Sequence, residues 1–178
     1  MAKTFTSSLP SVSTGDVYTA SAHNNVITTL NNHTVPPACA VYHTAAQSVP
    51  NATWTTVLFN SEYYDTDAMH DTATNTSRIT ISTTGIYLLT ANILFDIGGT
   101  GNRQVDFMKN GSGFIYRGQT TNNISASFFT DVSTSTMMSL TAGDYMEVIV
   151  YQTNGAALNI RGDAGGVHFA AAFMGKTA

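Results

Sequence analysis

Charged residues are scarce in this 178-residue chain. They make up 10% of the sequence, compared with about 25% in an average globular domain. Only seven residues are Lys or Arg, and the formal net charge is -4. Proteins that bind nucleic acids neutralise phosphates with clustered basic side chains, and the sequence contains no such cluster. The composition therefore argues against nucleic acid as a partner.

Cysteine and long apolar runs are also lacking. Cys39 is the only cysteine, so the chain can form neither an intrachain disulfide scaffold nor a cysteine-type zinc site of its own. No apolar run approaches the roughly 20 residues that a membrane-spanning helix needs. The first residues continue into a polar segment instead of an apolar signal region, so we expect no secretory signal and no membrane insertion.

Uncharged polar residues take the place of the missing charges. The sequence has 28 Thr, 15 Ser and 14 Asn, while hydrophobic residues make up 43%. That apolar fraction is enough for a folded core, and the length fits one domain with a short extension. Threonine favours half-buried strands over helix interiors. The composition therefore predicts an all-β protein.

Residues 1–37 differ from the rest and are expected to form an N-terminal arm. They carry only two charged residues and end at Pro36-Pro37. Ser21 is a candidate N-cap for a short helix over residues 22–32. Its apolar side chains form one narrow stripe: Val26, Ile27 and Leu30. Such a short helix is marginal alone, so the stripe must pack against something. We expect it to anchor the chain in an assembly; the alternative is a helix folded back on its own domain.

From residue 38 onward, apolar and polar residues alternate with period two, interrupted by turn residues. The expected strands cover residues 38–44, 53–59, 78–82, 86–95, 103–109, 113–117, 124–140, 144–152, 157–160 and 167–175. Asn110-Gly111 predicts a tight hairpin. The strands at 86–95 and 144–152 are apolar on both faces, so we expect a second cover beyond the core, such as a neighbouring subunit. Three loops are long enough for recognition: 60–77, 96–102 and 118–123.

Four short motifs in this order resemble the C1q-like jelly roll of the C1q and tumour-necrosis-factor superfamily. They are Thr84-Gly85-Ile86-Tyr87, Lys109-Asn110-Gly111, the Leu140 to Met146 turn with its Gly143-Asp144, and the closing strand His168 to Gly175. The resemblance implies a jelly-roll β-sandwich of about ten strands over residues 38–178. It also implies a homotrimer that binds or assembles and is not an enzyme. The interface candidates are Tyr145, Ile149, Tyr151 and His168.

Two departures from that family, the lack of a collagen-like repeat and of a signal peptide, argue against an animal complement or adipokine protein. The segments Gly15 to Asn25 and Glu62 to Asp71 instead resemble parts of bacteriophage virion proteins. We therefore expect a structural virion protein, assembled in the bacterial cytoplasm. In this interpretation it is a tail-associated or fibre-like appendage that contacts the host surface, with residues 1–37 binding other virion proteins. A capsid decoration or head-spike protein is the alternative, and a non-viral trimeric lectin-like or signalling ligand is a second one.

The acidic stretch supplies the candidate site residues. Carboxylates, a tyrosine and an imidazole suit a host glycan or protein receptor, which gives these contact candidates: Glu62, Tyr63, Asp67 and His70. Calcium is the one cofactor considered, because hard cations bind carboxylate oxygens in flexible loops. Its candidate ligands are Asp65, Asp67 and Asp71. The spacing matches no EF-hand, and the competing interpretation is that these side chains bond their own backbone. No nucleophile motif such as Gly-x-Ser-x-Gly is present, so we expect no enzymatic activity.

Overall fold

The computed structural model describes residues 17, 19–112, 114–116, 118, 120–123, 127–162 and 165–177. The chain divides into two compact units, Met1–Pro36 and Pro37–Ala178, which we call the arm and the body. This division lies one residue from the boundary expected between 37 and 38. Among the described residues, no helix is long and apolar enough to cross a membrane.

The described part of the arm contains one helix, α1 (Ala20–Thr34). It begins earlier than expected, because Thr19 is the N-cap instead of Ser21. The hydroxyl of Thr19 accepts a hydrogen bond from the backbone N–H of Ala22 at 3.2 Å, which satisfies one of the free donors of the first turn. Of the predicted stripe, Ile27 is 42% exposed and Val26 is half-buried. The side chain of Leu30 and the segment Gly15-Asp16 lie outside the described residues.

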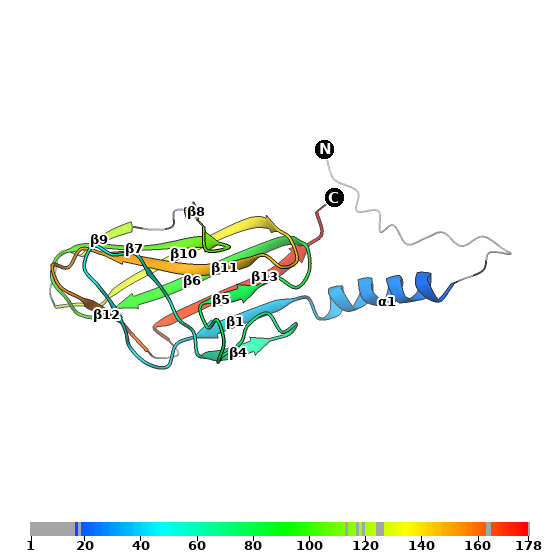
Figure 1. Cartoon of the computed structure of the whole chain (residues 1–178), viewed down its shortest axis with the longest axis horizontal. Coiled ribbons are helices and arrows are strands. Elements are labelled where there is room, and N and C mark those ends of the chain that lie inside the picture. The colour runs from blue at the N-terminus through cyan, green and yellow to red at the C-terminus, as the bar shows by residue number, and fades with distance from the viewer. Residues whose placement is uncertain are drawn as a thin grey trace. The chain divides into compact units, whose positions relative to one another are not determined.

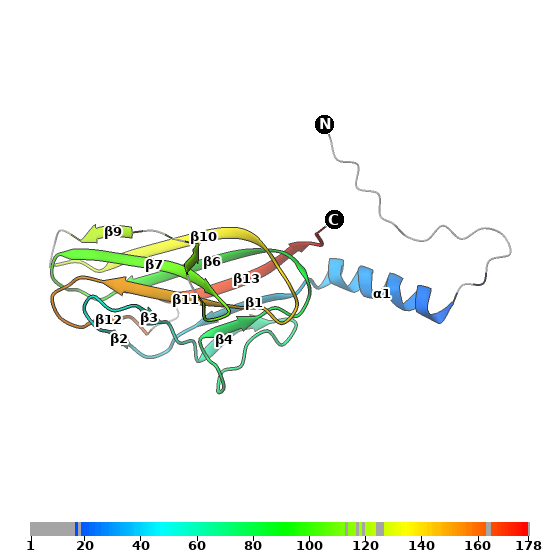
Figure 2. The ribbon, with the colours of Figure 1, turned by 45° about the horizontal axis from the view of Figure 1, so that its top comes forward.

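The body consists of two antiparallel sheets that pack face to face (Figures 1 and 2). The first sheet has the strand order β2 (Gln47–Val49), β12 (Leu158–Ile160), β6 (Gly85–Phe95), β13 (Val167–Gly175), β1 (Ala38–Tyr42) and β4 (Ser61–Asp65), with β10 (Thr130–Leu140) paired to β6. The second has the order β3 (Thr55–Thr56), β11 (Tyr145–Gln152), β7 (Gly101–Lys109) and β8 (Phe114–Tyr116), with β5 (Arg78–Thr80) paired to β11 and β9 (Thr120–Asn123) to β7. The predicted all-β jelly roll is confirmed.

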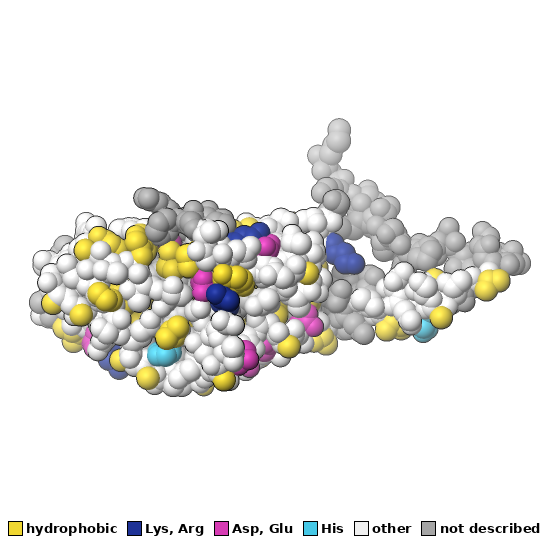
Figure 3. Space-filling model, in the orientation of Figure 1, with side chains coloured by type: hydrophobic (Ala, Val, Ile, Leu, Met, Phe, Trp, Pro, Cys, Tyr) yellow, Lys and Arg dark blue, Asp and Glu magenta, His cyan; other side chains and the backbone are white. Residues whose placement is uncertain are grey.

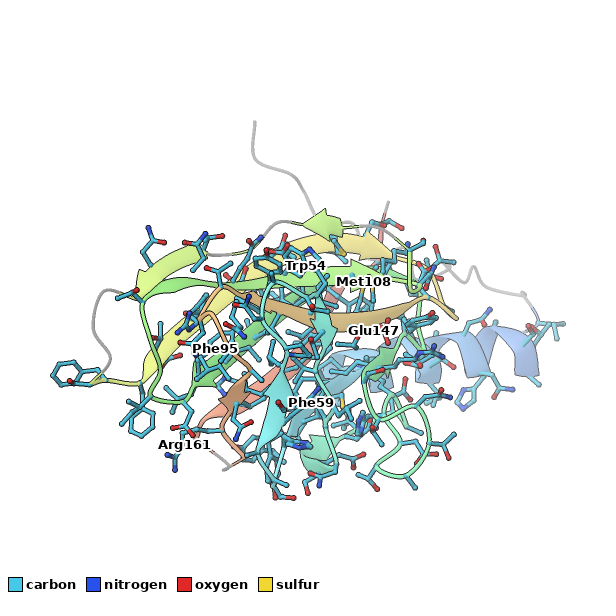
Figure 4. All side chains as sticks on the ribbon, turned by 60° about the vertical axis from the view of Figure 1, so that its left-hand side comes forward. Trp54, Phe59, Phe95, Met108, Glu147 and Arg161 are labelled. Atoms are coloured by element: carbon cyan, nitrogen blue, oxygen red, sulfur yellow. The ribbon has the colours of Figure 1, made fainter. Side chains whose placement is uncertain are left out.

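The core lies between the two sheets and follows the period-two pattern of the strands. In β6 every second residue from Tyr87 to Phe95 is buried, and the residues between them are half-buried on the outer face. Phe169 is at the centre of an aromatic cluster, 5.8 Å from Phe59 and 5.7 Å from Phe107 between ring centroids. Figure 4 shows Phe59 and Phe95 among these interior side chains. Cys39 is fully buried, and this burial raises the pKa of its thiol, so we expect it to be unreactive.

The hairpin predicted at Asn110-Gly111 is present between β7 and β8. Both residues have positive φ, 53° and 65°, and the backbone N–H of Ser112 donates to the carbonyl of Lys109 at 3.1 Å. These are the features of a type I′ turn, whose twist matches that of the flanking strands. Glycine and asparagine adopt this left-handed conformation at low cost, which is why the dipeptide predicted the turn.

Three strands were missed by the sequence pattern. β4 lies in the predicted loop 60–77, β9 in the predicted loop 118–123, and β2 precedes the strand expected at 53–59. Of the four residues after Ser61, three are exposed, because β4 is an edge strand that pairs only with β1. β9 is composed of Thr and Asn. An edge strand without an apolar face leaves no period-two signal in the sequence. The expected strand 124–140 begins at Thr130 in the structure, and residues 124–126 lie outside the described part.

Candidate recognition surfaces

The acidic stretch folds into β4 and a loop that is tied down by its own side chains. The imidazole of His70 is fully buried, with Nδ1 3.0 Å from Glu62 Oε1 and Nε2 3.2 Å from the carbonyl oxygen of Thr76. The prediction of His70 as a direct receptor contact is therefore corrected: its side chain holds β4 to the loop. Tyr63 is half exposed, and its ring centroid lies 4.5 Å from that of Tyr42.

The three candidate calcium ligands serve the same loop. Asp65 accepts hydrogen bonds from the backbone N–H groups of Asp67 and His70 at 3.1 and 2.8 Å, and Asp71 accepts those of Ala73 and Thr74 at 2.8 and 3.0 Å. Asp67 accepts a short hydrogen bond from the hydroxyl of Ser82. The backbone hydrogen bonds also lower the pKa of Asp71. Within the described residues, no three His, Cys, Asp or Glu side chains are placed to hold a metal ion.

A pocket of about 280 Å³ opens beside this loop. The residues that line it include Met69, Asp71, Thr74, Asn75, Arg78 and Thr80. Arg78, which comes from β5, lies outside every motif identified in the sequence. No local motif could have found it, because its partners Tyr145 and Glu147 belong to β11, a strand far along the chain.

Arg78 is fixed by these two residues of β11. Its guanidinium carbon lies 4.0 Å from the ring centroid of Tyr145, and its Nε lies 3.6 Å from Glu147 Oε1. Glu147 is 5% exposed and accepts a hydrogen bond from the hydroxyl of Ser77 at 2.7 Å. Figure 4 labels Glu147 next to Met108, its cross-strand neighbour in β7. A cation stacked on an aromatic ring and paired with a buried carboxylate has little freedom to move.

The central part of the outer face of the first sheet carries no charged side chain, although Asp131 lies on the same face opposite Leu94, towards the start of β10. Strand register places its central side chains in three rows: Tyr42, His168, Asn92 and Ser133; Ala40, Ala170, Thr90 and Ser135; Ala38, Ala172, Leu88 and Met137. None of them is Asp, Glu, Lys or Arg. The interface candidate His168 lies in the first row. A sheet face that meets water usually carries charged side chains, so this composition is typical of a covered face.

The other three interface candidates lie on the outer face of the second sheet, which the chain partly covers itself. Ile149 is only 4% exposed, and its cross-strand neighbour Asp106 is fully buried. The backbone N–H of Gly118 donates to Asp106 Oδ1 at 2.9 Å, and the ring of Trp54 lies 5.0 Å from that of Tyr151. Contrary to the expectation for 144–152, Ile149 therefore needs no neighbouring subunit to cover it.

The two ends of the body differ. β1 starts at Ala38, which pairs with Ala172, and Ala172 pairs in turn with Leu88 near the start of β6. The arm therefore joins the body at the end where β6 begins, which we call the proximal end. The distal end, where β6 finishes and β10 starts, carries three exposed apolar side chains: Ile97, Phe128 and Phe129. The guanidinium of Arg161 lies 4.8 Å from the ring centroid of Phe129.

Asp144, in the turn after β10, gives a pH-dependent prediction. Partial burial alone raises the pKa of Asp144, but hydrogen bonds from Lys109 Nζ, Asn110 Nδ2 and the Thr141 N–H outweigh this and lower it to about 2. Because the pKa of Asp144 is lower in the folded state than in the unfolded chain, its ionised carboxylate stabilises the fold above about pH 4. This contribution is lost as the pH falls towards 2. We expect Asp144→Asn to lower the free energy of unfolding by about 1 kcal/mol at neutral pH. Urea unfolding should show this difference shrinking below about pH 3. A difference that is independent of pH would contradict the assignment.

Comparisons with known proteins agree with this fold. The C1q domain model matches residues 38–165. No protein with a curated description matches the sequence. Murine APRIL at pH 5.0 superposes with a TM-score of 0.58 at 16% identity, covering 78% of this chain and 98% of that one. Eiger TNF from S. frugiperda gives 0.57 at 16% identity (80% and 96% covered), and the globular domain of zebrafish complement 1qA gives 0.52 at 14% (79% and 99% covered). At such low identities, the solved structures support a shared fold only. Since the C1q domain model matches more than half of this chain, the chain belongs to the C1q domain family.

Proposed function

We propose that the chain is a non-enzymatic, homotrimeric structural protein of a bacteriophage virion. In this proposal it is a tail-associated or fibre-like appendage that contacts the host surface. The observation that carries the proposal is the absence of charged side chains from the three central rows of the outer face of the first sheet. The phage context is supported by the sequence resemblance of the arm and of the acidic stretch, and by the division of the chain into an arm and a larger body.

The outer face supports association with copies of the same chain. The three rows combine small, uncharged polar and apolar side chains, and paired alanines in two of them allow close approach of a partner. Burial of such a face stabilises an assembly when the free energy gained by removing it from water exceeds the free-energy cost of association. Light scattering should give three times the chain mass of 18.9 kDa. A monomer at micromolar concentration would overturn the trimer.

The arm is proposed to bind another virion protein. Its helix has an apolar stripe in which Ile27 is 42% exposed. Removal of residues 1–36 should leave a folded body whose far-ultraviolet circular dichroism spectrum loses the signal of α1 and keeps that of the β-sheets, because the core cluster of the described residues lies beyond Pro37. It should also abolish incorporation into particles, measured by immunoblotting of purified virions. Normal incorporation of the truncated protein would show that the arm is not the anchor.

Host contact is proposed for the distal end. β6 spans 11 residues, so the two ends of the body are about 33 Å apart. If the arm holds the protein to the particle, the end opposite Ala38 is the one that faces outward. The exposed rings of Phe128 and Phe129 lie there, whereas Asp67 lies near the proximal end, next to Thr66, whose N–H bonds the carbonyl of Ala38.

Paired substitutions separate the two candidate contact surfaces. We expect Phe128→Ser combined with Phe129→Ser to reduce attachment of the fluorescently labelled protein to host cells by at least about tenfold, since exposed aromatic residues often dominate binding. Tyr63→Ser in the acidic stretch should leave attachment within about twofold. If Tyr63→Ser reduced attachment and the double Phe variant did not, the host contact would lie in the acidic stretch. Melting temperatures of all variants serve as the folding control.

Two other functions remain as alternatives. A capsid decoration or head-spike protein would share the fold, the arm and the outer face, and a particle image with the labelled protein would distinguish it. A non-viral lectin-like or signalling ligand is the other, since APRIL and Eiger TNF share the jelly roll at 16% identity. Absence of the protein from purified phage particles would favour that alternative.

A further inference from the structure

The pocket beside β5 contains several polar groups that have no partner within the described part of the chain. The terminal guanidinium nitrogens of Arg78 donate no hydrogen bond there, and neither do the side chains of Asn75, Thr74 and Thr80. Asp71 bonds its own loop through Oδ1, and among the described residues no hydrogen bond reaches its Oδ2. The pocket thus presents donors and acceptors together.

Arg78 and the backbone of the loop are held in place before any ligand arrives. Arg78 is stacked on Tyr145 and paired with Glu147, and its backbone N–H donates to the carbonyl of Asn75 at 3.0 Å. The loop is further fixed by the hydrogen bond from the Thr80 N–H to the carbonyl of Met69 at 2.7 Å. Preorganised polar groups bind a ligand without the cost of ordering them.

The charges at the pocket indicate what kind of ligand fits. Arg78 contributes a positive charge and Asp71 a negative one, while the carboxylate of Glu147 already faces the guanidinium. A phosphate or carboxylate ligand would meet the repulsion of Asp71. A neutral ligand with neighbouring hydroxyl groups can accept a hydrogen bond from Arg78 and donate one to Asp71 at the same time. Figure 3 shows that the few charged side chains of one face of the molecule are scattered among uncharged ones.

We propose that this pocket binds one uncharged sugar ring, with Arg78 and Asp71 holding adjacent hydroxyl groups and Asn75 and the two threonines bonding the remainder. Its volume of about 280 Å³ is slightly smaller than that of most small-molecule sites and suits a single ring. The site belongs to the body alone, so it does not depend on the trimer, on the phage context or on which end contacts a host.

The test is a titration of the full, 15N-labelled chain with glucose, galactose, mannose and N-acetylglucosamine, followed by amide chemical shifts. N-Acetylneuraminate and inorganic phosphate are titrated in parallel as anionic probes. We expect at least one neutral sugar to give saturable shifts in residues 68–80, with a Kd on the order of 1 mM, as a single polar site of this size allows. Saturable shifts with the anionic probes alone would overturn the proposal, and so would no shift in residues 68–80 at about 100 mM sugar, far above the expected Kd.

Variants show whether the named side chains make the contact. Asn75 has φ 55°, so Asn75→Gly removes the amide while keeping a backbone conformation that glycine favours. Asn75→Gly and Arg78→Lys should each weaken binding at least about fivefold, and the exposed Asn159→Ala on β12 should leave it unchanged. Melting temperatures show whether each variant is folded. If either variant unfolds, Asp71→Asn takes its place, because it keeps Oδ1 as an acceptor for the loop. Equal affinity in all folded variants would overturn the assignment.

Discussion

In the proposed trimer, replacing Leu88 with Asp should cause dissociation into monomers. Leu88 lies in the third row of the outer face, between Ala172 and Met137, and is half-buried within its own chain. In a separate monomer the new carboxylate can reach water. In an assembly that buries this face the carboxylate would lose its hydration, and no Lys or Arg of its own three rows could pair with it.

Light scattering at micromolar concentration measures this effect. The expected mass falls from that of three chains to that of one chain, 18.9 kDa. Leu88→Met, which conserves volume, and Ser48→Asp, which adds the same charge at an exposed position of β2, should both remain trimeric. A Leu88→Asp protein that keeps the threefold mass would show that this face is not the interface. Circular dichroism of the monomer separates dissociation from unfolding.

Replacing Arg103 should cause a large loss of stability. Arg103 is fully buried, and its guanidinium donates to the carbonyls of Asn102 and Gly99 at 3.0 and 2.8 Å and to Asn154 Oδ1 at 3.1 Å. Burial lowers its pKa, but an arginine remains protonated. Within the described residues, no carboxylate pairs with it. The charge is therefore compensated by oxygen dipoles of the loops at the distal end.

Arg103→Ala leaves these oxygen atoms without a donor and creates a cavity. We expect it to lower the free energy of unfolding by about 3–5 kcal/mol, a large part of the stability of a typical domain. Arg103→Lys should cost about 2 kcal/mol, because an ammonium group cannot reproduce the planar geometry of three bonds. Urea unfolding at one fixed protein concentration measures both losses. The control is Arg161→Ala, a change of a half-buried arginine at the same end, which should lower the free energy of unfolding by about 1 kcal/mol or less. A loss below about 1 kcal/mol for Arg103→Ala would contradict this account.

The candidate sites were only partly predictable from sequence. Proximity in sequence identified the acidic stretch, and there Asp65 and Asp71 bond the backbone of their own loop. Proximity in sequence did not reveal that the His70 side chain is buried, because this burial depends on the pairing of β4 with β1. The pocket was missed altogether, since Arg78 meets Tyr145 and Glu147 only through the pairing of β5 with β11. Arg103 was missed for the same reason: its partner Asn154 is 51 residues away.

The sequence by itself determined the β class, the hairpin at Asn110-Gly111 and the division near Pro36. Each of these depends on local physics: strand propensity with period-two burial, the left-handed turn that Asn-Gly adopts easily, and the inability of proline to continue a helix. Tertiary structure alone decided which strands lie at an edge, which of the two outer faces the chain covers itself, and which end of the body carries exposed aromatic residues. These properties depend on pairings between strands far apart in sequence. A residue's own neighbours do not determine such pairings, because the hydrogen-bonding pattern of one strand accepts many partners.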